Sequence, residues 1–283
     1  KAVDSCLEVL GLLCLAFKDK IDPFVEDICA TIENDEINYA KSIPCSMLAC
    51  ILEAIPSKVN SFVLSIAERI HPVSTQSYSI LITAILKHQP SLVDPRSTYQ
   101  IIESIPFGSL IAPAIASFIT AYPNYIFKFL PSLQNEFTNE DKLDNHNVLN
   151  LFLLVAKVPQ FDVGPFWDIF FKLLPNSKNK DDILECLFCL IKKEDDKEQL
   201  QKLSILFYAL YSFNDQNSKV KIFKLVDQEL IKHFTDKVLF MILENFFESD
   251  DLLVSQEALN FIKRIRDLYP LATLNFFIQN LST

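Results

Sequence analysis

The chain of 283 residues is half apolar and 22% charged, which is the composition of a folded protein and not of a disordered one. Its three glycines are too few for the phosphate loops, tight turns and bulges of Rossmann, P-loop and most barrel enzymes. The net charge of -10 and the pI near 4.9 oppose the basic balance of nucleic-acid-binding proteins and favour basic partners.

Prolines repeat along the chain at a nearly constant interval. The first five of the series lie 33, 34, 33 and 36 residues apart and are Pro23, Pro56, Pro90, Pro123 and Pro159. Each stands between two apolar stretches, at the place where a helix ends or begins, because proline lacks the N–H that a helix interior needs. Pro270 follows after 111 residues, or three further units of 37. We therefore expect eight units, with approximate bounds 1–34, 35–71, 72–106, 107–138, 139–176, 177–214, 215–249 and 250–283.

Within each unit the apolar residues recur every three or four positions, as in Val3, Cys6, Leu7, Leu10 and Leu13, which is the period of an amphipathic helix. We therefore predict that each unit consists of a first helix, a short turn and a second helix. The expected pairs are 2–18 with 22–33, 35–54 with 57–70, 74–88 with 94–105, 107–121 with 124–136, 141–157 with 163–174, 180–193 with 196–212, 217–233 with 236–248, and 252–268 with 271–281.

Two short amphipathic helices cannot bury their own apolar faces, whereas a stack of such pairs can. No stretch shows the two-residue alternation of a strand. The sequence therefore predicts an all-α fold, a right-handed α-α superhelix of the HEAT or armadillo type. We expect one continuous array over residues 1–283, without an interdomain linker.

Two segments raise the question of targeting or membrane insertion. The chain begins with Lys1, so we interpret it as a segment of a longer or trimmed chain. Its first apolar stretch contains Asp4 and Glu8, which do not suit a signal peptide. Residues 104–127 carry no charge, but prolines, a glycine and hydroxyl residues interrupt them, so we expect a buried helix and no membrane span.

The residues that could carry catalysis or bind a metal do not form a recognisable pattern. Cys186 and Cys189 are the only C-x-x-C pair; they lie within a predicted helix, and no second pair completes a zinc site. We expect these thiols to be buried. The four histidines fall in four different units, without a pattern that supplies a nucleophile and an orienting partner. We therefore expect no enzymatic activity, no cofactor and no metal.

Acidic side chains and one tryptophan are the candidate partner-binding residues. If the second helices line the inner surface of a curved array, their carboxylates form an acidic trough that attracts Lys/Arg-rich segments. Trp167 either packs in the core or receives a partner side chain. The candidates are Glu26, Asp27, Glu33, Glu68, Glu103, Glu136, Trp167, Asp168 and Glu244.

Three stretches resemble importin-β-type (karyopherin-β) nuclear transport receptors, nearest to the branch that carries ribosomal proteins and histones. They are NVLNLFLLVAKVPQFDVGPFWDIFFKLLPNSKNKDDILECLFCLIKK at 147–193, DEINYAKSIPCSMLACILEAI at 35–55, and SQEALNFIKRIRDLYPLATLNFFIQNLS at 255–282. The last is similar to the closing repeat of these receptors. The chain departs from the family in a shorter segment between Ile43 and Asn147, without the acidic insertion.

The resemblance implies the carboxy-terminal part of a carrier that shuttles between cytoplasm and nucleus. Such a carrier binds basic cargo segments on its inner face, binds phenylalanine-glycine nucleoporin repeats between outer helices, and releases cargo to Ran in its GTP form. No nucleic acid is implied as a direct partner. The alternative is a HEAT or armadillo scaffold or adaptor, such as a phosphatase regulatory subunit or a vesicle-coat or cytoskeletal adaptor, since the fold alone does not decide function.

Overall fold

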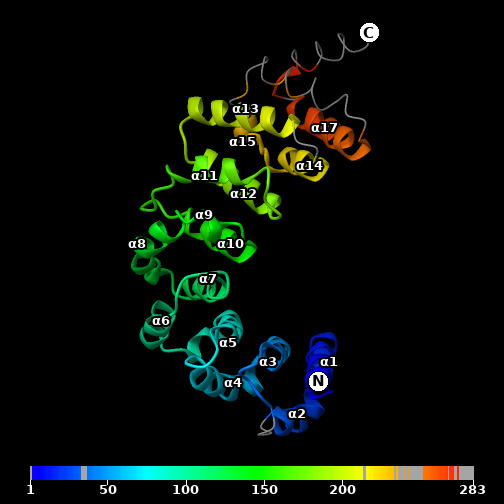
Figure 1. Ribbon diagram of the computed structural model, residues 1–283. Coiled ribbons are helices and arrows are strands. Elements are labelled where there is room, and N and C mark those ends of the chain that lie inside the picture. Colours follow the sequence, from blue (N-terminus) through cyan, green and yellow to red (C-terminus); the bar gives the residue numbers. More distant parts are fainter. Residues whose placement is uncertain are drawn as a thin grey trace. The chain divides into compact units, whose positions relative to one another are not determined.

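The computed structural model describes residues 2–32, 37–212, 215–232 and 251–266, together with 234, 239, 242, 268–270 and 273. Every regular element in these residues is a helix, and consecutive helices pack against one another, which confirms the predicted all-α solenoid class (Figure 1). The chain forms two compact units, residues 1–154 and residues 155–283. The boundary falls inside the predicted unit 139–176, so a single continuous array stays a prediction.

Unit 1 consists of helices α1 to α10, with three short 3-10 turns between them. Their bounds are α1 Ala2–Phe17, η1 Lys18–Phe24, α2 Val25–Ile32, α3 Ser42–Ala54, α4 Pro56–Ile70, α5 Thr75–His88, η2 Pro90–Leu92, α6 Pro95–Ser104, α7 Ala112–Ala121, η3 Pro123–Tyr125, α8 Ile126–Glu136, α9 Glu140–Leu143 and α10 His146–Val155.

The helices described in unit 2 are α11 Phe166–Leu173, α12 Lys180–Ile191, α13 Asp196–Ser212, α14 Gln216–Leu225, α15 Gln228–Ile231 and α17 Leu252–Ile265. The predicted helix 217–233 of unit 2 is wrong as a single element, because it is split into two helices at residues 226–227. The predicted helices at 236–248 and 271–281 lie outside the described residues, apart from single positions.

Prolines and side-chain caps set the beginnings of the helices, as the repeat predicted. Pro56 opens α4, and Pro90 and Pro123 open the 3-10 turns η2 and η3. The predicted helix 141–157 is wrong as a single element, because it is split into α9 and α10. The break comes at Asn145, whose side-chain oxygen accepts the N–H of Asn147 in the first turn of α10 and so starts a new helix.

The first helices of the repeats pack directly against one another and form what we call the first-helix row. In unit 1 the row is α1, α3, α5 and α7, and in unit 2 it is α12, α14 and α17. Gly11 shows how close this contact is, since a Cβ atom there would lie 3.2 Å from the Cα of Met47 on α3. Small residues thus let neighbouring first helices approach closely.

The bend of unit 1 corrects one expectation. Figure 1 shows α1, α3, α5 and α7 on the inner side of the arc of unit 1, and α2, α4, α6 and α8 on its outer side. Helices on the inner side of a bend must be more closely spaced, in agreement with the direct contacts along the first-helix row. The prediction that second helices line the inner surface is therefore wrong for unit 1.

The core is apolar and rich in phenylalanine. Phe118, Phe137 and Phe152 are fully buried in unit 1, as are Phe207 and Phe223 in unit 2. Phe118 contacts the rings of Tyr122, Tyr125 and Phe129 in tilted or edge-on geometry. Burial of each such ring contributes on the order of 2–3 kcal/mol relative to exposure. None of the described helices is both long and apolar enough to cross a membrane, and the uncharged stretch 104–127 comprises the ten-residue α7, the 3-10 turn η3, the adjoining ends of α6 and α8, and the turns between them.

A tyrosine that precedes a repeat proline ties one repeat to the preceding one. The hydroxyl of Tyr122 donates to the carbonyl of Pro90 and lies 3.1 Å from that of Val93. In unit 2 the hydroxyl of Tyr269, before Pro270, lies 2.8 Å from the carbonyl of Ile231. The polar end of each ring thus satisfies turn carbonyls, and the ring itself packs among apolar side chains.

Substitution of Tyr122 by Phe removes this link and keeps the ring. We expect the free energy of unfolding to fall by about 1 kcal/mol, because carbonyls at the η2 turn lose a donor. Tyr125→Phe is the matched control, since the Tyr125 hydroxyl has no hydrogen bond to another described residue, and it should change stability by less than about 0.5 kcal/mol. Urea denaturation followed by circular dichroism measures both; equal effects would contradict the link.

Candidate functional site

The structure brings two of the predicted partner-binding residues together and leaves most of the others apart. Glu26 and Asp27 lie exposed on α2, and Glu68 lies exposed on α4. Glu103 on α6 and Glu136 on α8 line one cavity. Glu33 and Glu244 lie outside the described residues.

The inner side of unit 1 does not carry the carboxylates that were expected to form a trough. Along the first-helix row, α1 carries Asp4 and Glu8, α3 carries Glu53, α5 carries Lys87, and α7 carries no charge. The carboxylates of α2, α4, α6 and α8 belong to the outer row (Figure 1). The expected trough of second-helix carboxylates therefore does not line the inner side of this unit.

The cavity that joins the two glutamates, which we call the outer pocket, lies between α6 and α8 and has a volume of about 250 Å³. Phe107 and Phe129 form aromatic parts of its wall, and Lys128 also lines it. The local charge is balanced, because Lys142 donates to Glu136 at 2.5 Å and Lys128 also reaches the pocket.

Both carboxylates of the outer pocket already hold one donor each. The hydroxyl of Tyr99 donates to Glu103 at 2.6 Å, and burial together with this hydrogen bond raises the pKa of Tyr99 to about 12, so it stays a donor at neutral pH. A carboxylate offers about four acceptor positions, so each glutamate can take a further donor.

Two lysines of the chain place their ammonium groups on aromatic rings of this surface. The ammonium group of Lys142 lies 5.7 Å from the Phe107 ring centroid as well as on Glu136. The ammonium group of Lys128 lies 4.4 Å from the Tyr125 ring and 5.1 Å from the Tyr99 ring. The α6–α8 surface thus holds a cation on an aromatic ring at two places, and at one of them, Lys142, a carboxylate also takes part.

Trp167 and Asp168 lie on α11 in unit 2, whereas the two glutamates belong to unit 1. Trp167 is half-buried and stacks on Phe171 with centroids 5.8 Å apart, and Lys202 of α13 lies 5.2 Å from its ring. Asp168 is exposed. Trp167 is therefore neither a core residue nor an open binding platform, because a lysine of the next repeat covers part of its face.

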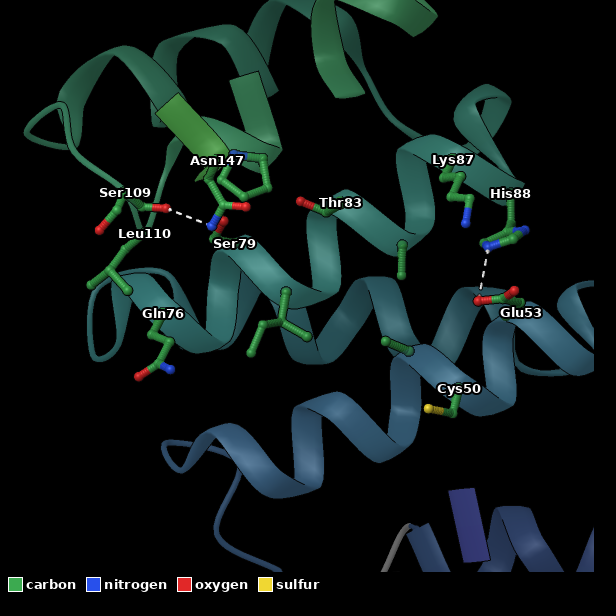
Figure 2. Close-up of a pocket in the computed structure, with 14 residues that line it drawn as sticks. Cys50, Glu53, Gln76, Ser79, Thr83, Lys87, His88, Ser109, Leu110 and Asn147 are labelled. Carbon is green, nitrogen blue, oxygen red and sulfur yellow. Dashed lines mark hydrogen bonds and ion pairs between the residues drawn. The ribbon is translucent and has the colours of Figure 1, made fainter. Parts of the chain in front are cut away.

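A second cavity, which sequence reasoning missed, lies along the first-helix row of unit 1, and Figure 2 shows the residues that line it. This inner groove has a volume of about 400 Å³, within the usual range of ligand sites. Figure 2 shows that one face of α5, from Gln76 to Lys87, runs along it, with Cys50 and Glu53 of α3 on one side and Leu110 on the other. The groove forms only where α3, α5 and the 109–113 segment pack together, and no sequence motif indicates it.

The inner groove is mainly apolar and carries polar groups at its two ends. At one end Asn147 donates its side-chain amide to the carbonyl of Ser109 at 3.3 Å, and at the other end His88 lies 3.9 Å from Glu53. Between them the hydroxyl oxygen of Thr83 is buried and has no hydrogen-bond partner among the described residues. The ammonium group of Lys87 forms no ion pair with another described residue.

The environment of His88 favours its neutral form. Burial lowers the pKa of His88 below its ordinary 6.5, the neighbouring Lys87 lowers it further, and Glu53 opposes both by attraction. The groove end therefore carries Glu53 and Lys87 as its charged groups at neutral pH.

The two thiols of the C-x-x-C pair on α12 lie in surroundings that keep them protonated. Cys186 is fully buried, as predicted, and burial raises its pKa well above the ordinary value. Cys189 is only partly buried, and its pKa is raised by the same cause. A raised pKa keeps a thiol protonated and unreactive. The described residues contain no group of three or more His, Cys, Asp or Glu side chains that could hold a metal ion.

Comparisons of the chain with protein-family models, with curated proteins and with solved structures find no match. The likeness to nuclear transport receptors thus rests on the sequence stretches alone.

Glu53→Gln should lower the pKa of His88, because the substitution removes the only attraction that favours the imidazolium, and Lys87→Gln should raise it. The pKa of His88 in the folded chain lies below the value of about 6.5 for the unfolded chain. The unfolded chain therefore binds this proton first, and the folded chain loses stability as the pH falls from about 6.5 through the folded-state pKa. An NMR titration of the His88 ring measures the pKa in the wild type and both variants. A wild-type pKa at or above 6.5 would contradict the environment described.

Proposed function

We propose that this protein is a non-enzymatic, protein-binding helical-repeat module that binds a Lys/Arg-containing segment of its partner at the outer pocket. The observation that carries the proposal is the meeting of Glu103 and Glu136 in one cavity with aromatic walls. The cations of Lys128 and Lys142 on the same surface support it, because they show that ammonium groups are held there by rings and carboxylates.

The corrected geometry changes how such binding would work. In place of a long-range acidic trough, recognition depends on short contacts at a locally neutral pocket. A guanidinium or ammonium group of the partner would donate a second hydrogen bond to Glu103 or Glu136, or it would displace Lys142 from Glu136. We infer moderate affinity with residue-level specificity, since a half-exposed ion pair contributes only about 0–1 kcal/mol unless its geometry is fixed.

The proposed cellular role is nuclear import of basic cargo, with Ran and phenylalanine-glycine nucleoporins as further partners and with shuttling between cytoplasm and nucleus. Its support is the set of sequence stretches that resemble the receptors. A scaffold or adaptor is the second candidate, and the apolar inner groove favours it, because an import receptor of the expected kind would place acidic residues there.

A fluorescein-labelled Lys/Arg-rich peptide, titrated with the full chain and followed by fluorescence anisotropy, tests the site. Glu103→Gln with Glu136→Gln should weaken binding about tenfold, because charge-assisted hydrogen bonds are lost. Glu68→Gln is the matched control, since Glu68 is an exposed glutamate of the same outer row outside the pocket, and it should leave the affinity within about twofold.

Added salt should weaken the wild-type complex and affect the double variant less. Absent binding, or equal affinities for the double variant and the control, would overturn the proposed site. A phenylalanine-glycine repeat peptide in the same assay separates the two cellular roles, because a scaffold should not bind it.

A further inference from the structure

We propose that the inner groove is a docking site for an amphipathic helix of a partner protein, whose apolar face packs along α5 and whose acidic side chain reaches Lys87. This inference does not depend on the outer pocket, because it concerns the other row of helices and a partner of different chemistry.

The backbone around the groove favours a helix over an extended peptide as its occupant. The groove is lined by α3, α5, Asn147 of α10 and the segment 109–113, which comprises a turn and the start of α7, so it offers no strand edge among the described residues. An extended peptide would bury its own N–H and C=O groups against an apolar wall without partners, at a cost of about 1–3 kcal/mol for each. A helix satisfies its backbone internally and presents only side chains.

The dimensions and the small residues of the floor fit a helix face. The face of α5 that lines the groove runs over Gln76, Ser79, Ile80, Thr83, Ala84 and Lys87, which follow a helical spacing. At about 1.5 Å of rise per residue this stripe is roughly 16 Å long, or three helical turns. The small side chains of Ala84 and of Ala49 on α3 leave room for another helix to approach closely, as Gly11 does where α1 meets α3. A partner helix would thus repeat the helix-on-helix contact of the first-helix row.

The polar groups define the chemistry of the partner. Lys87 is exposed, ends the stripe and forms no ion pair with another described residue. Glu53 on the opposite wall faces His88 and lies half-exposed. A carboxylate on the partner helix therefore completes the pairing of Lys87.

The probe is a labelled synthetic helix of about four turns with leucines at i, i+3, i+4 and i+7 and a glutamate beyond the last leucine. A peptide of the same composition in scrambled order, without an apolar face, is the first control. A third peptide carries lysine in place of the glutamate. Fluorescence anisotropy with the full chain measures their dissociation constants.

We expect the patterned helix to bind and the scrambled peptide to bind at least about tenfold more weakly. Leu110→Glu, which places a charge on the half-exposed wall of the groove, should weaken binding about tenfold. Val73→Glu is the matched control, because Val73 is 68% exposed outside the groove, and it should have an effect below about twofold. Lys87→Glu should reverse the preference between the glutamate and lysine peptides.

Circular dichroism of each variant excludes unfolding as the cause, and binding of the Lys/Arg-rich peptide at the outer pocket should stay unchanged in Leu110→Glu. Equal binding of patterned and scrambled peptides, an unaffected Leu110→Glu variant, or an unchanged charge preference in Lys87→Glu would each overturn the proposal.

Discussion

The direct packing of each first helix on the next one is the constraint on which the rest of this structure depends. A short helix pair leaves an apolar stripe uncovered, and only the neighbouring pair can cover it. In unit 1 this packing is close enough that Gly11 meets the backbone of Met47, and the whole row from α1 to α7 lies on the inner side of the bend. The curvature, the inner groove and the position of the acidic side chains all follow from this contact.

The two rows of unit 1 consequently differ in chemistry. From α3 to α7 the inner row carries only Glu53 and Lys87 as charged side chains, and the groove along α5 is mainly apolar. The outer row is less crowded, so its long polar and aromatic side chains meet in pairs, such as Lys142 with Glu136 and Lys128 with Tyr125. One row therefore suits an apolar helix face, and the other suits single cationic side chains.

The candidate residues illustrate how far a sequence reaches toward a site. Glu103 and Glu136 were expected on consecutive second helices, and equivalent positions of neighbouring repeats do lie close together, which is why they share a cavity. Glu68 belongs to the same set by sequence, yet it lines neither the outer pocket nor the inner groove. Trp167 was expected either in the core or open to a partner, and the covering by Lys202 depends on a contact between repeats that periodicity does not contain.

The sequence by itself determined the helical class and many of the helix bounds, because apolar periodicity and proline act locally, within a few residues of the positions they affect. It also predicted the burial of Cys186, since an apolar run at helical spacing must face a core. Only the tertiary structure decided which row faces inward, because the direction of a bend depends on the difference in spacing between two rows, and small residues such as Gly11 set that difference by fractions of an ångström. The inner groove is a product of the same packing, so no single segment of the sequence encodes it.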